Sequence, residues 1–140
     1  MATDEPQTWT VLRLLEWTKD YFTRSEIDSP RIAAEVLLSH VLNCQRIELY
    51  ARYNQQPDDA QRQAFRALVK RAAAGEPVAY LVGSKEFYSL AFEVNANVLI
   101  PRPETEQLVE RTLAHLKAIG RGGAVWDVCT GSGCIAVTME

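Results

Sequence analysis

The chain lacks three features that would assign it quickly to a class of protein. None of its apolar runs approaches the roughly 20 residues that a bilayer-spanning helix requires. Its net charge of −3 provides no general basic field that would attract nucleic acid. The acidic N-terminus, MATDEP, lacks the basic and then apolar pattern of a signal peptide. We therefore expect a cytoplasmic protein that contacts neither a membrane nor nucleic acid directly. We also expect a monomer, although none of these three features bears on the oligomeric state.

Cysteine is also sparse, and its placement argues against disulfides and metal. Cys44, Cys129 and Cys134 are odd in number and have no CxxC spacing. We expect reduced thiols and no metal site. A hydrophobic content of 47% and a charged content of 24% are typical of a globular chain. A length of 140 residues allows one domain, or a small domain and part of another.

Helical spacing of apolar residues dominates the first part of the chain. It predicts a bundle of about four or five short helices within residues 1–80, one of them starting at Ser29-Pro30 and another within residues 56–59, with Pro57 in its first turn. His40 lies on an apolar stripe, where a hydrogen-bonded histidine in the core or at its boundary is favoured over a catalytic one. The residues expected on the apolar stripes are Val11, Leu14, Leu15, Tyr21, Phe22, Ala33, Val36, Leu37, Val41, Phe65, Leu68, Val69 and Ala72. No metal or nucleophile spacing occurs there, which favours a docking domain for a basic protein or an RNA-bound partner.

The pattern changes at Gly83. Residues 85–88 and 91–94 are aromatic and β-prone, and they predict a hairpin that turns at Ser89-Leu90. Residues 98–100 follow as a short buried extended segment. We therefore divide the chain into a helical docking domain (1–80), a β-hairpin linker (81–97) and the start of a ligand-binding domain (98–140).

A proline-stiffened corner follows the hairpin. Pro101 and Pro103 restrict the backbone, and Thr105 is placed to cap a helix over residues 106–119. The corner presents Arg102, Glu104, Thr105 and the neighbouring Glu106. Two interpretations remain open: a helix cap with solvated charges, or a corner that closes over a ligand carrying both a carboxylate and an ammonium group.

The last residues predict a buried strand, a glycine turn and a helix. The strand covers residues 124–128, the turn residues 130–133, and the helix begins at Cys134. The sequence GSGCIA fits the weak dinucleotide pattern G-x-G-x-x-A, so a nicotinamide cofactor is one candidate. S-adenosylmethionine is the other, with Asp127 near its amino group. The turn's shape does not decide between them, and a purely structural turn is the third possibility.

Residues 85–136 resemble the S-adenosylmethionine-dependent protein-glutamine N5-methyltransferases that modify class I peptide release factors. The segments that carry this resemblance are EFY (86–88), VLIPRPETEQLVE (98–110) and DVCTGSGCIAV (127–137). The helical half also looks like that family's substrate-docking domain. The resemblance covers essentially the whole chain but only about the first half of a family member. A sister family that methylates a glutamine of a ribosomal protein is a nearby alternative.

The resemblance implies an α+β protein: a helical bundle, a hairpin and the truncated start of a Rossmann-like methyltransferase domain. It implies S-adenosylmethionine as cofactor and a class I release factor as partner. The residues that would bind the cofactor are Phe87, Arg102, Glu104, Thr105, Asp127, Cys129, Thr130, Gly131, Ser132 and Gly133. The family's Asn-Pro-Pro-Tyr loop is absent, so we expect an inactive fragment without catalytic residues, or a module that only docks. The family usually has glycine at the position of Cys129, which would be costly if that residue needs a positive φ.

Overall fold

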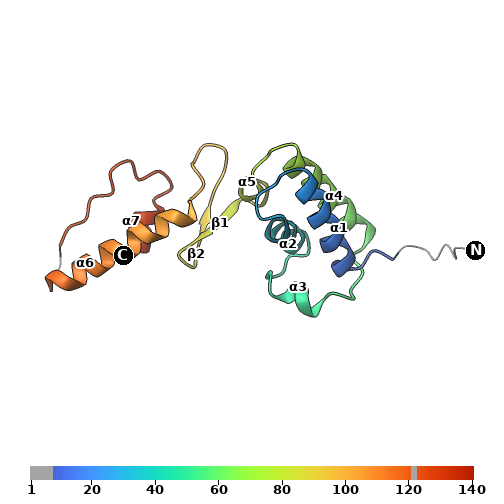
Figure 1. Ribbon diagram of the computed structural model, residues 1–140, viewed down its shortest axis with the longest axis horizontal. Helices are drawn as coiled ribbons and strands as arrows, with labels where there is room; N and C mark the ends of the chain where they lie inside the picture. The colour runs from blue at the N-terminus through green and yellow to red at the C-terminus, as the bar shows by residue number, and fades with distance from the viewer. Residues whose placement is uncertain (1–7, 121–122) are drawn as a thin grey trace, which may run out of the picture. The chain divides into compact units, whose positions relative to one another are not determined.

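The computed structural model describes residues 8–120 and 123–140 (Figure 1). The chain divides into two compact units, with the boundary between Val82 and Gly83. In the described residues the first unit is entirely helical, and the second combines helices with one two-stranded antiparallel sheet. This mixture agrees with the predicted α+β class. None of the described helices has both the length and the apolar character needed to cross a membrane.

The first unit confirms the predicted short helices. It contains α1 (Val11–Arg24), α2 (Pro30–Val41), α3 (Glu48–Ala51), α4 (Asp59–Ala73) and α5 (Val78–Val82). Helix α2 packs against α1, α4 and α5, so it lies at the centre of the bundle (Figure 1). The bundle is therefore organised around α2.

The helix starts differ in detail from the sequence prediction. Asp58 and Gln61 form a reciprocal capping box at the start of α4, so Pro57 lies before the cap and not in the first turn as predicted. Pro30 occupies the first turn of α2 as expected. Ser29, however, makes no side-chain cap bond, since its backbone is left-handed with φ 49° and is not in the extended conformation of a capping residue.

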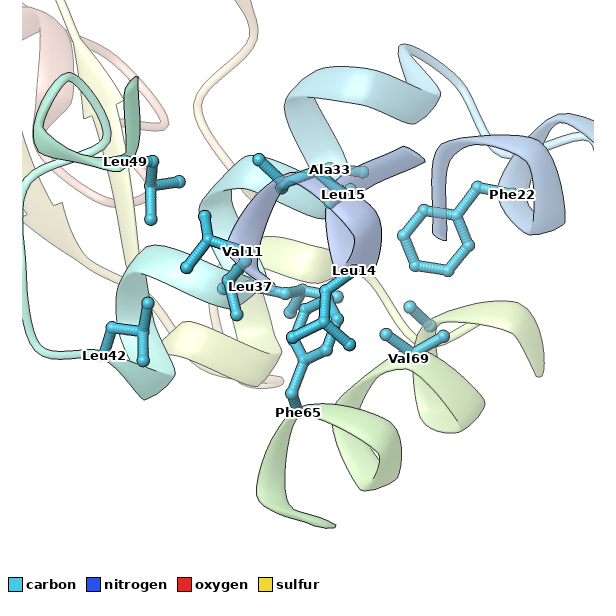
Figure 2. Close-up of a cluster of buried hydrophobic side chains, with 13 residues drawn as sticks. Val11, Leu14, Leu15, Phe22, Ala33, Leu37, Leu42, Leu49, Phe65 and Val69 are labelled. Carbon is cyan, nitrogen blue, oxygen red and sulfur yellow. The ribbon is translucent and has the colours of Figure 1, made fainter. Parts of the chain in front are cut away.

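One hydrophobic core holds the bundle together. Figure 2 shows Phe65 and Val69 of α4 pointing toward Leu14 of α1. The buried members of this core are Val11, Leu14, Leu15, Phe22, Ala33, Ala34, Leu37, Leu38, Leu42, Leu49, Phe65, Val69 and Ala72. Most of the predicted stripe positions are therefore confirmed as core positions.

Five expectations for the core were not fully met. Tyr21, Val36, Val41 and Leu68 are only partly buried, because the bundle covers a narrower face of each helix than the apolar stripe suggests. His40 is exposed, so it is not the core histidine that the stripe favoured. It belongs to the last turn of α2 and faces solvent there.

The second unit contains the predicted hairpin, with its turn one residue earlier than expected. Its elements are β1 (Ser84–Phe87), β2 (Leu90–Glu93), the 3₁₀ turn η1 (Pro103–Thr105), α6 (Glu106–Ile119) and α7 (Cys134–Thr138). Tyr88 and Ser89 form the turn with φ values of 50° and 62°. Two successive positive φ values are typical of the type I′ hairpin turn.

Charge explains the observed hairpin register. Lys85 pairs with Phe92, and Glu86 pairs with Ala91. A turn one residue later, as the sequence suggested, would place Glu86 directly opposite Glu93, and like charges in that position destabilise a sheet. The observed register avoids this repulsion by pairing Glu93 with Ser84.

The second unit has a much smaller core. Its buried members are Phe87 of the hairpin, Val109 of α6 and Cys134 of α7. Helix α6 has the predicted bounds and ends at Gly120, whose φ of 66° suits glycine; Gly122, also expected to end it, lies outside the described residues. Only part of the apolar stripe of α6 is buried, because Leu108 and Ile119 are exposed.

The predicted buried strand at residues 124–128 is wrong for this structure. Residues 123–127 are irregular, and Val125, Trp126 and Val128 are exposed, Trp126 to 86%. Among the described residues the only strand pairing joins β1 to β2, so no neighbouring strand accepts this segment. The expectation for residues 98–100 fails similarly, because Leu99 is exposed.

Candidate functional site

The glycine turn combines small side chains with left-handed backbone. Cys129, Gly131 and Gly133 have φ values of 65°, 60° and 77°. The amide of Gly133 donates to the carbonyl oxygen of Thr130 at 3.0 Å, which closes the turn before α7 begins. Glycine adopts this conformation without strain, so the two glycines are explained by the backbone itself.

Cys129 occupies a conformation that disfavours a side chain. The family that the sequence resembles usually has glycine at this position, which suggested that the residue needs a positive φ. In the structure the φ of Cys129 is indeed positive. A Cβ in the left-handed region costs on the order of 1–2 kcal/mol. The backbone therefore stores local strain at Cys129, an exposed residue directly before the turn.

Polar groups converge at this turn. Asp127 Oδ2 accepts a hydrogen bond from Thr130 Oγ1 at 2.8 Å. Ser132 Oγ accepts from the amide of Cys134 at 3.3 Å. In the described part of the chain, the amides of Gly131 and Ser132 donate to no acceptor. The turn therefore offers two backbone donors and one oriented carboxylate, which suits a ligand with a carboxylate and an ammonium group.

The predicted proline corner forms, although its capping differs. Arg102 is extended and exposed, and its carbonyl accepts from the amide of Thr105 at 3.0 Å. Pro103 opens the 3₁₀ turn, and Glu104 is exposed. The expected side-chain cap by Thr105 is wrong, because this residue already has helical angles and makes no cap hydrogen bond.

Glu106, grouped with the corner by the sequence, instead joins α6 to the hairpin. Its Oε1 accepts a hydrogen bond from the amide of Tyr88 at 2.8 Å. Tyr88 is the first residue of the hairpin turn, so Glu106 stabilises that turn. Phe87, just before it, is 1% exposed and meets Phe92 edge-to-face with ring centroids 6.1 Å apart.

A shared core brings the predicted site segments into one unit. Phe87, Val109 and Cys134 pack together, so the hairpin, the helix after the corner and the helix after the glycine turn have a common anchor. Within the described residues, no hydrogen bond or ion pair joins Arg102 to Asp127. The roles of the predicted residues in binding a cofactor therefore stay predictions. The described residues contain no cluster of His, Cys, Asp and Glu that could hold a metal ion.

Sequence reasoning missed a buried glutamate in the first unit that is bound by two arginines and a tyrosine. Glu35 is 3% exposed, and its Oε1 accepts from Arg31 Nε at 3.0 Å and from Tyr50 Oη at 3.1 Å. Arg46 Nε lies 3.4 Å from its other oxygen. The hydrogen bond to Glu35 is the main cause that raises the pKa of Arg31. A glutamate on the apolar face of α2, four residues after an arginine, was the available signal.

Comparisons with known proteins agree with the sequence resemblance. The family described as "PrmC N-terminal domain" matches residues 13–83, just over half of the chain. A protein of Rhodopirellula baltica named release factor glutamine methyltransferase is 50% identical over 142 aligned residues, covering 98% of this chain and 47% of that protein. A protein of the same name from Chlorobaculum tepidum is 42% identical over 139 residues, covering 96% and 47%.

A third relative extends the same picture. The Neisseria gonorrhoeae protein of that name is 50% identical over 110 residues, covering 79% of this chain and 39% of the relative. The chain thus spans about half the length of the curated relatives it matches. Because the family match covers just over half of the chain and these relatives agree with it, the chain belongs to the PrmC N-terminal domain family.

Proposed function

We propose that this chain supplies the docking domain and the first cofactor-binding turn of an enzyme that methylates the side-chain amide of a glutamine in class I release factors. The observation that carries this proposal is the 50% identity, over 98% of the chain, to a protein named release factor glutamine methyltransferase. The cofactor would be S-adenosylmethionine, and the second unit would begin a Rossmann-like domain. The cytoplasm, where release factors act, is the proposed location.

The glycine turn is the proposed contact for the methionine end of the cofactor. The amides of Gly131 and Ser132 would donate to its carboxylate, and Asp127 would accept from its ammonium group. The hydrogen bond from Thr130 supports this role, because it fixes one oxygen of Asp127 and leaves Oδ1 for the ligand. Cys129 and Gly133 would shape the backbone around these donors.

The proline corner is proposed to flank the same end of the cofactor. Arg102 and Glu104 are exposed, so both charges are available to a ligand, with Thr105 beside them. Phe87 would contribute apolar surface near the turn through its contact with Cys134. No residue of this chain is assigned to the methyl-transfer step. An amide nitrogen is a poor nucleophile, and its acceleration depends mainly on positioning the amide against the sulfonium methyl.

Thermal unfolding with added cofactor tests the ligand. S-adenosylmethionine should raise the melting temperature of the chain, and NAD should leave it unchanged. Asp127→Asn should weaken S-adenosylmethionine binding about tenfold, the loss typical of one charged hydrogen bond. Asp28→Asn, an exposed acid of the first unit, is the matched control. Stabilisation by NAD, or unchanged affinity in Asp127→Asn, would contradict the proposed site.

Transfer of labelled methyl tests the reaction and its substrate. The 140-residue chain should not methylate a release factor, since its sequence lacks the Asn-Pro-Pro-Tyr loop expected to hold the acceptor amide. A full-length enzyme containing it should label a release factor and not a ribosomal protein, and Arg102→Ala in that enzyme should raise the KM for the cofactor. Labelling by the short chain would contradict the assignment of no catalytic residue.

A further inference from the structure

A groove of about 400 Å³ lies on the first unit between α1 and α4. Its base consists of Leu14, Phe65 and Val69, which are buried members of the bundle core (Figure 2). Such a volume falls within the range of protein sites that hold apolar ligand groups. Because the base belongs to a packed core, the groove is a formed feature of the bundle.

Aromatic side chains form one side of this groove. Trp17 is 46% exposed and stacks on Tyr21 with ring centroids 5.2 Å apart. The ring of Trp9 meets Trp17 edge-on at 6.5 Å, and the guanidinium of Arg13 lies 5.4 Å from the centroid of Trp9. These contacts hold the rings in place before any partner arrives, which lowers the entropy cost of binding.

The rim of the groove is cationic. Arg62 and Arg66 line it, together with Asp59, which forms an ion pair with Arg62. Across the residues that the structure describes, neither Arg66 nor the nearby Arg13 forms an ion pair with a carboxylate. Two arginines are therefore uncompensated beside an apolar base, and an anionic partner would complement them.

We propose that this groove binds an acidic amphipathic helix of a protein partner. The apolar face of the helix would enter between Trp17 and Phe65, and its carboxylates would meet Arg66 and Arg13. An apolar groove with charged edges is the usual receptor for an amphipathic helix. This partner differs in charge from the basic protein that the sequence suggested. The groove can bind such a helix whether or not the second unit binds a cofactor.

A designed peptide tests the proposal on the complete 140-residue chain. The probe is a fluorescent helical peptide with leucine on one face and glutamate on the other. We expect saturable binding, read by anisotropy, that weakens as salt concentration rises. A peptide with lysine in place of glutamate should bind at least about tenfold more weakly. A peptide with alanine in place of leucine should also lose binding, since its apolar anchors are gone.

Variants of the chain locate the binding. Arg66→Glu should weaken the acidic peptide about tenfold, and Trp17→Ala by about tenfold or more, as for an aromatic anchor in an interface. Lys70→Glu, an exposed charge reversal on the same helix outside the groove, is the matched control. Far-UV circular dichroism checks that each variant remains folded.

Three outcomes would overturn the proposal. Equal binding of the lysine peptide would exclude charge recognition. Unchanged affinity in both Arg66→Glu and Trp17→Ala would place the peptide elsewhere. Sedimentation showing a dimer that Arg66→Glu dissociates would assign the groove to a second copy of the chain.

Discussion

The two units differ in how completely they bury their apolar side chains. The helical first unit encloses a core that draws on α1, α2, α3 and α4. The second unit encloses Phe87, Val109 and Cys134 and leaves Leu99, Trp126 and Val128 exposed. Hydrophobic burial is the main favourable term in folding. The first unit is therefore expected to hold most of the stability of the chain, and the second to gain stability when its exposed side chains are covered.

The comparison also separates two kinds of local detail. In the first unit a buried polar group supports the core: Glu35 of α2 accepts from Arg31 and pairs with Arg46. In the second unit polar contacts lie at two turns with left-handed backbone, the hairpin turn and the glycine turn, whereas the left-handed residues of the first unit, such as Ser29, lie between packed helices. Strained backbone beside exposed polar groups is typical of ligand sites, whereas buried satisfied groups are typical of scaffolds.

The largest expected effect contrasts a leucine from each unit. Leu37→Ala should lower the free energy of unfolding by about 3 kcal/mol, since Leu37 is fully buried and its removal leaves a cavity. Leu99→Ala should change it by less than about 0.5 kcal/mol, because Leu99 is 72% exposed. Urea unfolding followed by far-UV circular dichroism measures both. Similar losses for the two variants would show that the exposed leucine is covered in solution, and the contrast between the units would fail.

The sequence predicted the first unit better than the second for a physical reason. Helices are specified by local spacing, so α1, α2 and α4 and their main core positions could be inferred from apolar periodicity. A strand is specified by its neighbours. Residues 124–128 have the composition of a buried strand, yet no described strand pairs with them. Composition alone therefore predicted a strand where the structure has an irregular segment.

The candidate site was predictable in its segments and not in its contacts. The glycine turn and the proline corner lie where sequence spacing placed them. The hydrogen bond from Tyr88 to Glu106, by contrast, joins residues far apart in the sequence, and it depends on the register of the hairpin. Glu35 was missed because apolar periodicity identifies only apolar residues as buried and cannot indicate a single buried acid.

The second effect concerns that buried acid. Glu35→Ala should lower the free energy of unfolding by about 2 kcal/mol, because the variant leaves Tyr50 and two arginines without their shared acceptor. The loss stays below that of a fully buried pair, since the side chains of Arg31 and Arg46 are half exposed or more and can be hydrated again. Glu16→Gln, on an exposed acid, is the control. Equal stability of Glu35→Ala and wild type would show that the cluster adds nothing to the bundle.

The third effect tests strain in the second unit. Cys129→Gly removes a Cβ from a residue with φ 65°, but glycine also adds freedom to the unfolded chain, so the net gain should be about 0.5 kcal/mol. Gly131→Ala should cost about 1 kcal/mol, because it introduces the same strain at φ 60°. Gly123→Ala is the control, since its φ is not in the left-handed region. Amide hydrogen exchange of the turn measures these changes, and faster exchange in Cys129→Gly would contradict the strain.

The smallest expected effect is a pH-dependent contact at the end of the first unit. Arg71 Nε and Nη2 donate to the two carboxylate oxygens of Glu76 at 2.7 and 2.6 Å, which ties the end of α4 to the segment that leads into α5. This hydrogen bonding lowers the pKa of Glu76 below its ordinary value, against a smaller opposing effect of desolvation. Both side chains are well exposed, so salt and water weaken the pair.

The sign of the pH dependence follows from that direction. Because the folded pKa of Glu76 lies below the unfolded one, the pair stabilises the fold above the unfolded pKa and loses this contribution as pH falls through the folded pKa. Glu76→Gln should therefore melt slightly below wild type at neutral pH, and the difference should shrink in acid. High salt should shrink it as well. A difference that grows as pH falls would mean that Glu76 stabilises the folded state when protonated, which the paired geometry with Arg71 does not allow.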